Sequence, residues 1–252
     1  MIFEKYSGSG NDFLITHICT QKNYAKLAQK LCNRNLGIGA DGLIILKPHP
    51  KYAYQWLFFN SDGSQAKMCG NASRCVGYYA FKHSLAPRKH TFLATDKPIE
   101  VEIKDSKKVR SNLGNFSAIE CLDIQTSYDI KAFKIDTGVP HIVIFTKNQE
   151  MLPKQKTLEL KTLREQHNAN INIAYIKNDD LIYVNTYERG VEDITLACGT
   201  GMAAVSIIAH TIFKTSKNPK CIPPSNEVLS FFIKDEEISF EGNVVFIATC
   251  II

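Results

Sequence analysis

Two short stretches of the sequence place a cysteine directly before a glycine, a small polar residue and an apolar run. The first extends from Met68 to Val76 and the second from Ala197 to Val205. This pattern is typical of a turn that leads into a helix with the cysteine at its N-terminus. The positive end of a helix favours thiolate, which lowers the thiol pKa from its free value of about 8.5. Cys69 and Cys198 are therefore candidate bases that can face one small anion from two sides.

An internal repeat relates the two stretches. A shift of 129 positions aligns Cys69 with Cys198 and Val76 with Val205. Further segments align at the same shift or at one differing by a single residue: Leu43–Ile45 with Asn172–Ala174, Phe58–Asn60 with Thr186–Glu188, and Gly10–Ile15 with Gly138–Val143. Self-similarity over half the chain predicts two similar domains related by a pseudo-twofold axis.

The composition is that of a globular protein with a sizeable core. Of 252 residues, 44% are hydrophobic, and the net charge is +5. Because the lysines are scattered among acidic residues, we expect no nucleic-acid partner. The longest apolar helix candidate, Met202 to Phe213, is too short to span a bilayer, and the N-terminal residues lack a signal-peptide pattern. We therefore expect a cytoplasmic protein with no membrane partner.

The cysteine content points to reduced thiols. There are eight cysteines and no Cys-x-x-Cys pair, which argues against a disulfide framework and against structural zinc. Apart from Cys69 and Cys198, we expect each cysteine to act as a buried, small apolar side chain: Cys19, Cys32, Cys75, Cys121, Cys221 and Cys250.

Hydrophobic spacing predicts the same order of elements in both halves. Strands are expected over 3–18 (interrupted at 7–10), 43–46, 54–60, 91–102, 108–116, 171–176 and 181–187, and two further strands are expected to end at residues 136 and 146. Helices are expected over 24–32, 69–85, 157–166 and 202–213. The helix from Met202 to Phe213 is apolar nearly all round, which predicts a buried helix. We therefore expect the strands of each domain to curl around that domain's own central helix.

One glycine motif in this order is misleading. Gly37 to Gly42 matches the dinucleotide fingerprint Gly-x-Gly-x-x-Gly letter for letter. That fingerprint follows a strand and opens a helix, whereas this one follows a predicted helix and opens a strand. We therefore expect no dinucleotide site here.

A family resemblance emerges from five motifs taken together. They are Asn60-Ser61-Asp62-Gly63-Ser64, Met68-Cys69-Gly70-Asn71, Gly138-Val139-Pro140-His141, Tyr187-Glu188-Arg189-Gly190 and Ala197-Cys198-Gly199-Thr200-Gly201. In this order and spacing the chain resembles the pyridoxal-independent diaminopimelate epimerases, over nearly its whole length. The resemblance implies an α+β fold of two pseudo-symmetric domains, each a mixed β-barrel wrapped around a central helix. The domains would span 1–117, with Cys69, and 118–252, with Cys198, and the final strand could pack back on the first domain.

The resemblance also implies an activity and a set of site residues. The reaction would invert one carbon of L,L-diaminopimelate to give the meso form, for lysine and peptidoglycan precursors. No cofactor or metal would be needed, diaminopimelate would be the small-molecule partner, and a homodimer is left open. Carried over by position, Cys69 and Cys198 are the two bases, and Gly70, Asn71, Gly199 and Thr200 offer backbone N–H groups to the α-carboxylate. Asn11, Asn60, Asn172, Glu188 and Arg189 would hold the substrate, while His141 and Glu188 would tune the cysteines.

The chemistry is consistent with these residues independently of the resemblance. Removing an α-proton from an amino acid leaves a carbanion, whose charge must be stabilised by donors aimed at the carboxylate when no pyridoxal is present. Two helix N-termini supply such donors. Inversion also requires a base on one face and an acid on the other, which a thiolate and a thiol provide near neutral pH.

Three features depart from the family pattern and bear on substrate preference. Gly42 stands where some members carry a glutamine, and Val139 stands where many carry an asparagine. The segment between Glu188 and Cys198 is also one residue longer than usual. The two-thiol arrangement is unaffected by these departures.

Other functions compete with this hypothesis. A racemase of another amino acid, such as proline or hydroxyproline, would share the fold, although Arg189 and the asparagines favour a substrate with a second charged end. The phenazine-pathway isomerase type lacks the cysteine pair. A thiol-redox or binding protein could use Cys69 and Cys198 as a reversible disulfide, but it gives no reason for Asn60 and Glu188-Arg189 at matching places in both halves.

Overall fold

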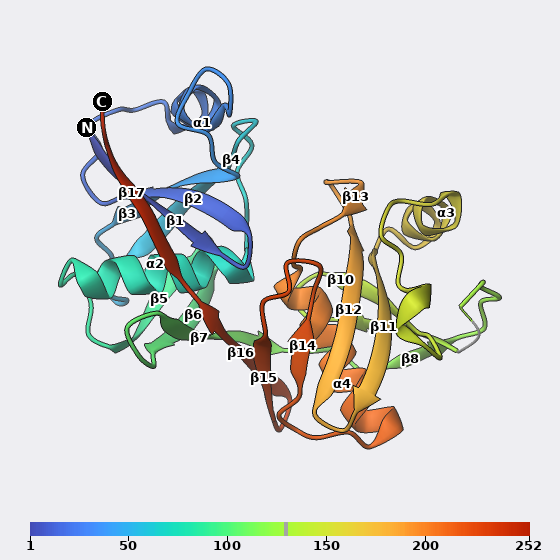
Figure 1. The fold of residues 1–252 in the computed structure, drawn as a ribbon. Coiled ribbons are helices and arrows are strands. Elements are labelled where there is room, and N and C mark those ends of the chain that lie inside the picture. Colours follow the sequence, from blue (N-terminus) through green and yellow to red (C-terminus); the bar gives the residue numbers. More distant parts are fainter. Residues whose placement is uncertain (129–130) are drawn as a thin grey trace. The chain divides into compact units, whose positions relative to one another are not determined.

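The computed structural model describes residues 1–128 and 131–252, which form two compact units (Figure 1). Unit 1 comprises Met1–Ser111 and Gly242–Ile252, and unit 2 comprises Asn112–Glu241. The division falls earlier than the expected boundary after residue 117, because the strand β7 (Lys108–Asn115) runs across it. The last residues of the chain belong to unit 1.

Unit 1 is a mixed sheet that closes around one helix. From β1 to β7 the neighbouring strands pair antiparallel, except for β2 with β3 and β4 with β5, which are parallel. Each parallel step needs a crossover, supplied by α1 and α2. The ring closes because β17 pairs antiparallel with β1 and the Val244 N–H donates to the Lys107 carbonyl at 2.6 Å. Its elements are β1 (Ile2–Gly8), β2 (Asn11–Thr16), α1 (Tyr24–Cys32), β3 (Gly42–Lys47), β4 (Gln55–Asn60), α2 (Gly70–Lys82), β5 (Lys89–Ala94), β6 (Lys97–Ile103), β7 and β17 (Val245–Ile251).

Unit 2 repeats this order of pairings. β9 pairs antiparallel with β10, β10 parallel with β11 across α3, β11 antiparallel with β12, and β12 parallel with β14 across α4. β14, β15 and β16 continue antiparallel, and the ring closes where the Phe116 N–H donates to Glu236 (3.2 Å) and the Ser117 N–H donates to Asp136 (2.9 Å). Its elements are β8 (Glu120–Leu122), β9 (Ala132–Asp136), β10 (Pro140–Phe145), the 3₁₀ turn Gln149–Met151, α3 (Leu158–His167), β11 (Asn170–Asn178), β12 (Leu181–Glu188), β13 (Asp193–Ile194), α4 (Gly199–Phe213), β14 (Lys220–Ile222), β15 (Leu229–Lys234) and β16 (Glu237–Asn243).

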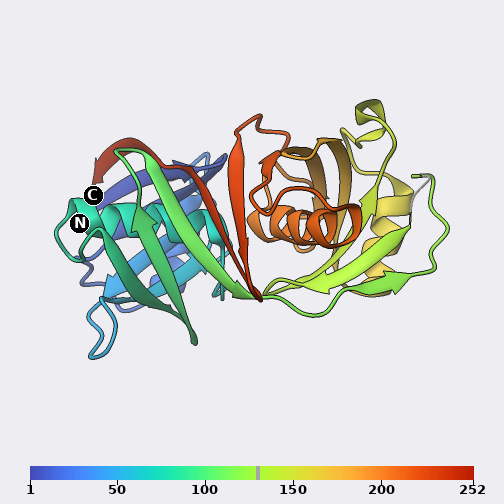
Figure 2. The same ribbon diagram turned by 90° about the horizontal axis from the view of Figure 1, so that it is seen from below.

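The same sequence of antiparallel and parallel steps in both units confirms the predicted fold of two pseudo-symmetric domains, each a mixed sheet around a helix. Figure 2 shows α2 (teal) and α4 (orange), each with strands of its own unit around it. On α4, every side chain from Met202 to Ala209 is at most 1% exposed, as a sequence that is apolar nearly all round predicts. On α2, Ala72, Cys75, Val76 and Ala80 are fully buried in the core of unit 1.

Two expectations about individual segments were wrong. The segment 91–102 is a hairpin rather than one strand, because Thr95, at φ 54°, ends β5 in a tight turn before β6 begins. Cys121 is exposed, since it lies on the short strand β8, which has few neighbours; Cys19 and Cys250 are only half-buried, whereas Cys32 and Cys221 are buried as expected. Within the described residues no helix is long and apolar enough to cross a membrane.

Candidate active site

Cys69 is the N-cap residue of α2. Its backbone is extended (φ −149°, ψ 119°), and its carbonyl accepts the first intrahelical bond, from the Ser73 N–H at 3.0 Å. The N–H groups of the three residues between them have no acceptor within the helix, as at any helix start. The half-buried thiol therefore lies at the positive end of a helix that offers several donors together.

Cys198 occupies the same place at the start of α4. Its backbone is also extended (φ −116°, ψ 104°), and its carbonyl accepts from the Met202 N–H at 3.0 Å. The residue is 7% exposed, and its Sγ lies 3.6 Å from the Thr200 Oγ1. Each unit thus presents one cysteine at the N-terminus of its central helix, where the sequence pattern places it.

A side-chain hydrogen bond fastens the first turn of each central helix to a neighbouring hairpin. In unit 1 the Asn71 Nδ2 donates to the Asn11 Oδ1 at 2.7 Å. In unit 2 the Thr137 Oγ1 donates to the Thr200 carbonyl at 3.0 Å. Val139, which aligns with Asn11 in the internal repeat, contributes its backbone carbonyl, which accepts from the Thr137 N–H at 3.2 Å. Thr137 therefore supplies the polar link to α4 that an asparagine supplies to α2.

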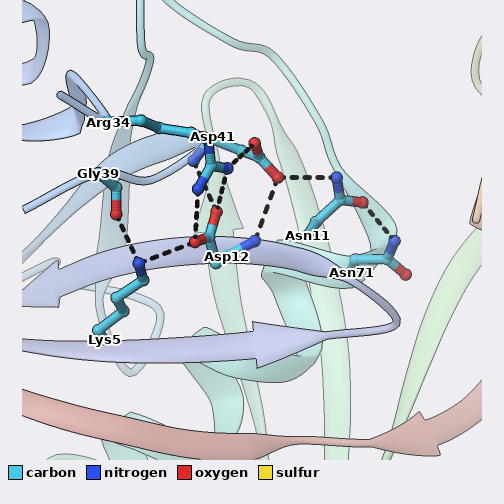
Figure 3. A network of polar contacts seen from close by, with 7 residues as sticks. All are labelled: Lys5, Asn11, Asp12, Arg34, Gly39, Asp41 and Asn71. Atoms are coloured by element: carbon cyan, nitrogen blue, oxygen red, sulfur yellow. Dashed lines mark hydrogen bonds and ion pairs between the residues drawn. The ribbon is translucent and has the colours of Figure 1, made fainter. Parts of the chain in front are cut away.

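Asn11 is held by a network of charged side chains in unit 1 (Figure 3). Its Nδ2 donates to the Asp41 Oδ2 at 3.0 Å, and the Arg34 guanidinium joins Asp41 (2.7 Å) to both oxygens of Asp12 (3.1 and 2.8 Å). The Lys5 Nζ contacts Asp12 at 2.9 Å. Because both ends of the Asn11 amide are bonded, to Asp41 and to Asn71, the side chain has one fixed orientation.

The charges of this network balance. Burial would raise the pKa of Asp12, but hydrogen bonds and ion pairs from Arg34 and Lys5 outweigh burial and hold that pKa below its usual value. The hydrogen bonds that Arg34 donates to Asp12 and Asp41 in turn raise the pKa of its guanidinium. The network pairs two basic side chains with two acidic ones, so it orients Asn11 without adding net charge.

His141 is a buried, neutral group in unit 2. It is fully inaccessible to solvent, and burial, with the Arg189 cation as a smaller contribution, lowers its pKa to about 3. Its Nδ1 lies 3.2 Å from the Asn172 Nδ2. At neutral pH this ring is an imidazole, and it cannot stabilise a thiolate as a cation.

Asn172 is also fully buried, and its amide is bonded inside unit 2. The Nδ2 donates to the Ile142 carbonyl at 2.8 Å, and the Oδ1 accepts from the Thr186 Oγ1 at 2.9 Å. The bonds that the structure gives to this side chain are therefore internal to unit 2. A direct contact between Asn172 and substrate stays a prediction.

Glu188 and Arg189 lie at the turn that follows β12. The Glu188 carbonyl accepts from the Val191 and Glu192 N–H groups at 3.2 and 2.8 Å, which closes the turn. The Arg189 N–H donates to the Asn170 Oδ1 at 2.8 Å, and its Nη1 donates to the Asn168 carbonyl at 3.0 Å. Within the described part of the chain the guanidinium makes no ion pair, so its charge is available to an anion. Its contact with substrate stays a prediction.

Asn60 ends β4 in an exposed turn, where its Nδ2 donates to the Ser64 Oγ at 3.0 Å. It pairs across the ladder with Gly42, and a Cβ at Gly42 would lie 2.5 Å from the Phe58 ring and 2.8 Å from the Phe59 carbonyl. The ring therefore fills the space that a longer side chain would need. This packing accounts for the glycine at position 42.

The structure thus groups the predicted residues within each unit. Unit 1 brings Asn11 and Asn71 together at the start of α2, which Cys69 heads, and unit 2 brings His141 beside Asn172. Residues that hold these groups were missed from sequence: Lys5, Asp12, Arg34, Asp41, Thr137, Thr186 and Gly201. Two of them, Arg34 and Asp41, lie in or just before the glycine-rich segment 37–42. Two charged residues beside a glycine-rich segment were the available signal for them, and we missed it because we considered the motif only as a nucleotide site.

The fold is shared with solved structures of low sequence identity. A probable proline racemase from Agrobacterium radiobacter K84, solved with bound carbonate, matches with a TM-score of 0.74 at 13% identity, covering 100% of this chain and 92% of the other. A phenazine biosynthesis protein of the PhzF family from Bacillus anthracis matches with a TM-score of 0.75 at 12% identity, covering 99% and 98%. These likenesses identify the fold alone.

Sequence comparison identifies the family. The family model for diaminopimelate epimerase matches residues 3–119 and 133–247. The diaminopimelate epimerase of Helicobacter pylori strain HPAG1 is 48% identical over 263 residues, covering 100% of this chain and 96% of the relative. That of a Nitratiruptor species is 42% identical over 241 residues, covering 95% and 94%. The chain therefore belongs to the diaminopimelate epimerase family.

Proposed function

We propose that this chain interconverts L,L-diaminopimelate and meso-diaminopimelate with Cys69 and Cys198 as its two bases. As a member of the diaminopimelate epimerase family it is an isomerase of lysine biosynthesis. The observation that carries the two-base assignment is that each unit places a cysteine at the N-cap of its buried central helix. One thiolate removes the α-proton on one face, and the opposite thiol delivers a proton on the other face.

The helix starts would stabilise the charge that develops during this reaction. Deprotonation sends negative charge onto the α-carboxylate, and the first N–H groups of α2 and α4 are donors for it. Gly70 and Asn71 supply them in one unit, and Gly199 and Thr200 supply them in the other. We propose that these donors replace the electron sink of a pyridoxal cofactor.

The remaining predicted residues would select and hold diaminopimelate, an amino acid with a second amino and carboxyl group. Arg189 carries a cation without an ion pair in the described chain, which suits the distal carboxylate. Asn11, Asn60 and Glu188 provide further polar contacts in this proposal, and Glu188 also acts on the cysteine of its own unit. His141 stays neutral and acts as a hydrogen-bonding group.

A substrate panel tests the activity. Purified protein is incubated with L,L-diaminopimelate, L-proline and trans-4-hydroxy-L-proline, and the stereoisomers are separated by chiral chromatography. We expect inversion of diaminopimelate alone, and its loss in both Cys69→Ala and Cys198→Ala. The substitution Cys32→Ala, at a buried cysteine that heads no helix, serves as the matched control and retains activity. Inversion of proline instead would contradict the proposed substrate.

Two further properties belong to this proposal. We place the protein in the cytoplasm, because the spacing of its eight cysteines lacks the pattern of a disulfide framework, as is usual in a reducing compartment. A homodimer is the proposed assembly, and sedimentation at several protein concentrations tests it. A concentration-independent monomer mass would contradict it.

A further inference from the structure

The amide of Asn172 has one possible orientation in unit 2. Its nitrogen faces the Ile142 carbonyl at 2.8 Å, a place where an oxygen would be repelled. Its oxygen accepts from the Thr186 hydroxyl at 2.9 Å on the opposite side. Because Asn172 is fully buried, water does not compete for either group. The second hydrogen of the Nδ2 then has two acceptors in range, the His141 Nδ1 at 3.2 Å and the Asn170 carbonyl at 3.5 Å, and it is directed to the nearer one.

This orientation decides the protonation of the His141 ring. An amide nitrogen is a donor and never an acceptor, so the Nδ1 of His141 must accept and cannot carry a proton. A neutral imidazole holds its single proton on the other nitrogen, which here is Nε2. The Nε2 is buried and has no hydrogen-bond partner among the residues that the structure describes. A buried donor without an acceptor is costly, which indicates that this N–H meets an acceptor during function.

The Asn172 amide also lies directly beneath the first turn of α4. A Cβ added to Gly201 would lie 2.2 Å from the Asn172 Oδ1 and 3.1 Å from the Thr186 Oγ1. Glycine is therefore required at this position while Asn172 keeps its place. A continuous set of contacts runs from His141 through Asn172 to the helix that Cys198 heads.

We propose that Asn172 is a positioning residue that holds His141 as its Nε2–H tautomer, so that the ring donates a hydrogen bond and cannot act as a base. The acceptor it serves is an anion of the reaction, either the thiolate or the substrate carboxylate. This role rests on the proposed epimerase function.

Nitrogen NMR of the imidazole rings tests the tautomer without requiring turnover. In protein labelled with ¹⁵N-histidine, the chemical shifts of Nδ1 and Nε2 report which nitrogen carries the proton. The His141 signals are assigned among the seven histidines by their loss in His141→Gln. We expect protonated Nε2 and unprotonated Nδ1 at pH 7. A proton on Nδ1 in the unaltered protein would overturn the proposal.

The substitution Asn172→Asp replaces the donor facing Nδ1 by an oxygen that accepts. We expect the proton to move to Nδ1, or the ring to become an imidazolium, with kcat/KM reduced at least about tenfold. Asn185→Asp is the matched control on the adjacent strand, where the amide donates to the Pro153 carbonyl at 2.9 Å. In that variant we expect the His141 signals of the unaltered protein.

A second pair of variants covers the case in which Asn172→Asp does not fold. Thr186→Val removes one of the two bonds that orient the Asn172 amide, while the Ile142 carbonyl keeps the other, and we expect a minor population of the second His141 tautomer to appear. Thr186→Ser keeps the hydroxyl and should keep the single tautomer. An unchanged tautomer in Thr186→Val and in any folded Asn172→Asp protein would overturn the proposal. If the unaltered protein shows the Nε2–H tautomer but does not invert diaminopimelate, the proposed function fails while the tautomer assignment stands.

Discussion

At the scale of single residues, the two units hold their site side chains in different ways. Asn11 is oriented by ionised groups, because Asp41 and Arg34 lie near the surface, where solvent lowers the cost of charge. His141 is oriented by neutral groups, because it is fully buried and a charge there would be expensive. A site side chain is therefore oriented by an ion-pair network in unit 1 and by the Asn172 amide and the Thr186 hydroxyl in unit 2.

The buried histidine makes stability depend on pH. Its folded-state pKa is lowered to about 3, whereas an unfolded histidine titrates near 6.5, so the unfolded chain takes up a proton first as pH falls. The free energy of unfolding should therefore decrease below about pH 6.5, and between pH 7 and pH 5 the loss from this group is about 2 kcal/mol. His141→Asn removes that contribution.

Urea unfolding at both pH values measures this difference. Burial also lowers the pKa of His17 and His90, so these two histidines add to the pH dependence of stability. They are present in both the unaltered protein and His141→Asn, and their contributions therefore cancel when the two proteins are compared. Equal pH dependence in the unaltered protein and His141→Asn would show that His141 is protonated in the folded state.

The substitution Asp41→Asn tests the charged network around Asn11. A single amide oxygen cannot serve Arg34, the Asn11 amide and the Asp12 N–H together, so Asn11 loses its fixed orientation. We expect kcat/KM to fall about threefold to tenfold, while stability changes by less than about 1 kcal/mol, because the ion pair is partly exposed. Asp105→Asn, in a turn of the same unit that bonds only backbone groups, is the control and should leave kcat/KM unchanged.

At the scale of elements, the helix N-termini were the most predictable features. Cysteine, glycine and a small polar residue before an apolar run specify where α2 and α4 begin, and both begin directly after the cysteine. The hairpin at Thr95 was missed, because threonine is a frequent strand residue and its positive φ depends on the turn it enters. The contacts of Asn172 were also hidden, since they join β10, β11, β12 and α4, which are distant in sequence.

Gly201 shows how one of these contacts constrains a helix. Alanine is favoured over glycine inside a helix by about 1 kcal/mol, but its Cβ would lie 2.2 Å from the Asn172 oxygen. We expect Gly201→Ala to destabilise the protein by about 1–3 kcal/mol, as overpacking does. Gly77→Ala in α2 is the comparison for a clash with an apolar side chain, because its Cβ would lie 2.8 Å from the Val101 Cγ2 and 3.1 Å from the Val101 Cβ.

Thermal unfolding of the two glycine variants separates clash from propensity. Both substitutions gain the same helix propensity, so a Tm of Gly201→Ala below that of the unaltered protein measures the cost of the contact with Asn172, and the Tm of Gly77→Ala gives the cost of a clash with a buried valine. An unchanged or higher Tm in Gly201→Ala would mean that Asn172 can leave its place without cost, which would also weaken its role in orienting His141.

At the scale of the whole molecule, the internal repeat predicted the topology. The segment pairs that align at a shift near 129 lie on equivalent strands and helices of the two units, and both sheets have the same order of parallel and antiparallel steps. The structure divides the chain within β7 and β16, which run from one unit into the other without a break in hydrophobic pattern, whereas the sequence pattern predicted a boundary after residue 117. Inversion at a carbon requires one acid–base group on each of its two faces. A repeat in which each copy contributes one cysteine at a helix N-cap supplies such a pair.

The two-thiol mechanism predicts an isotope pattern that no single base would give. If one thiolate removes the proton and the opposite thiol supplies another, the hydrogen delivered to the inverted carbon comes from a thiol that has exchanged with water before substrate binds. In deuterated water, early product should carry deuterium at its new centre, while unreacted substrate stays largely protiated. A single base moving between faces could return the original proton, and it would label both isomers, or neither, at similar rates.

Mass spectrometry of the separated isomers at low conversion measures this asymmetry. The kcat/KM profile should form a bell with one limb for each thiol, because one must be ionised and the other protonated. Cys69→Ala and Cys198→Ala should each abolish inversion, since each thiol acts on its own face of the carbon. Equal early labelling of substrate and product, or near-normal inversion by either alanine variant, would mean that one unit alone carries the proton transfer.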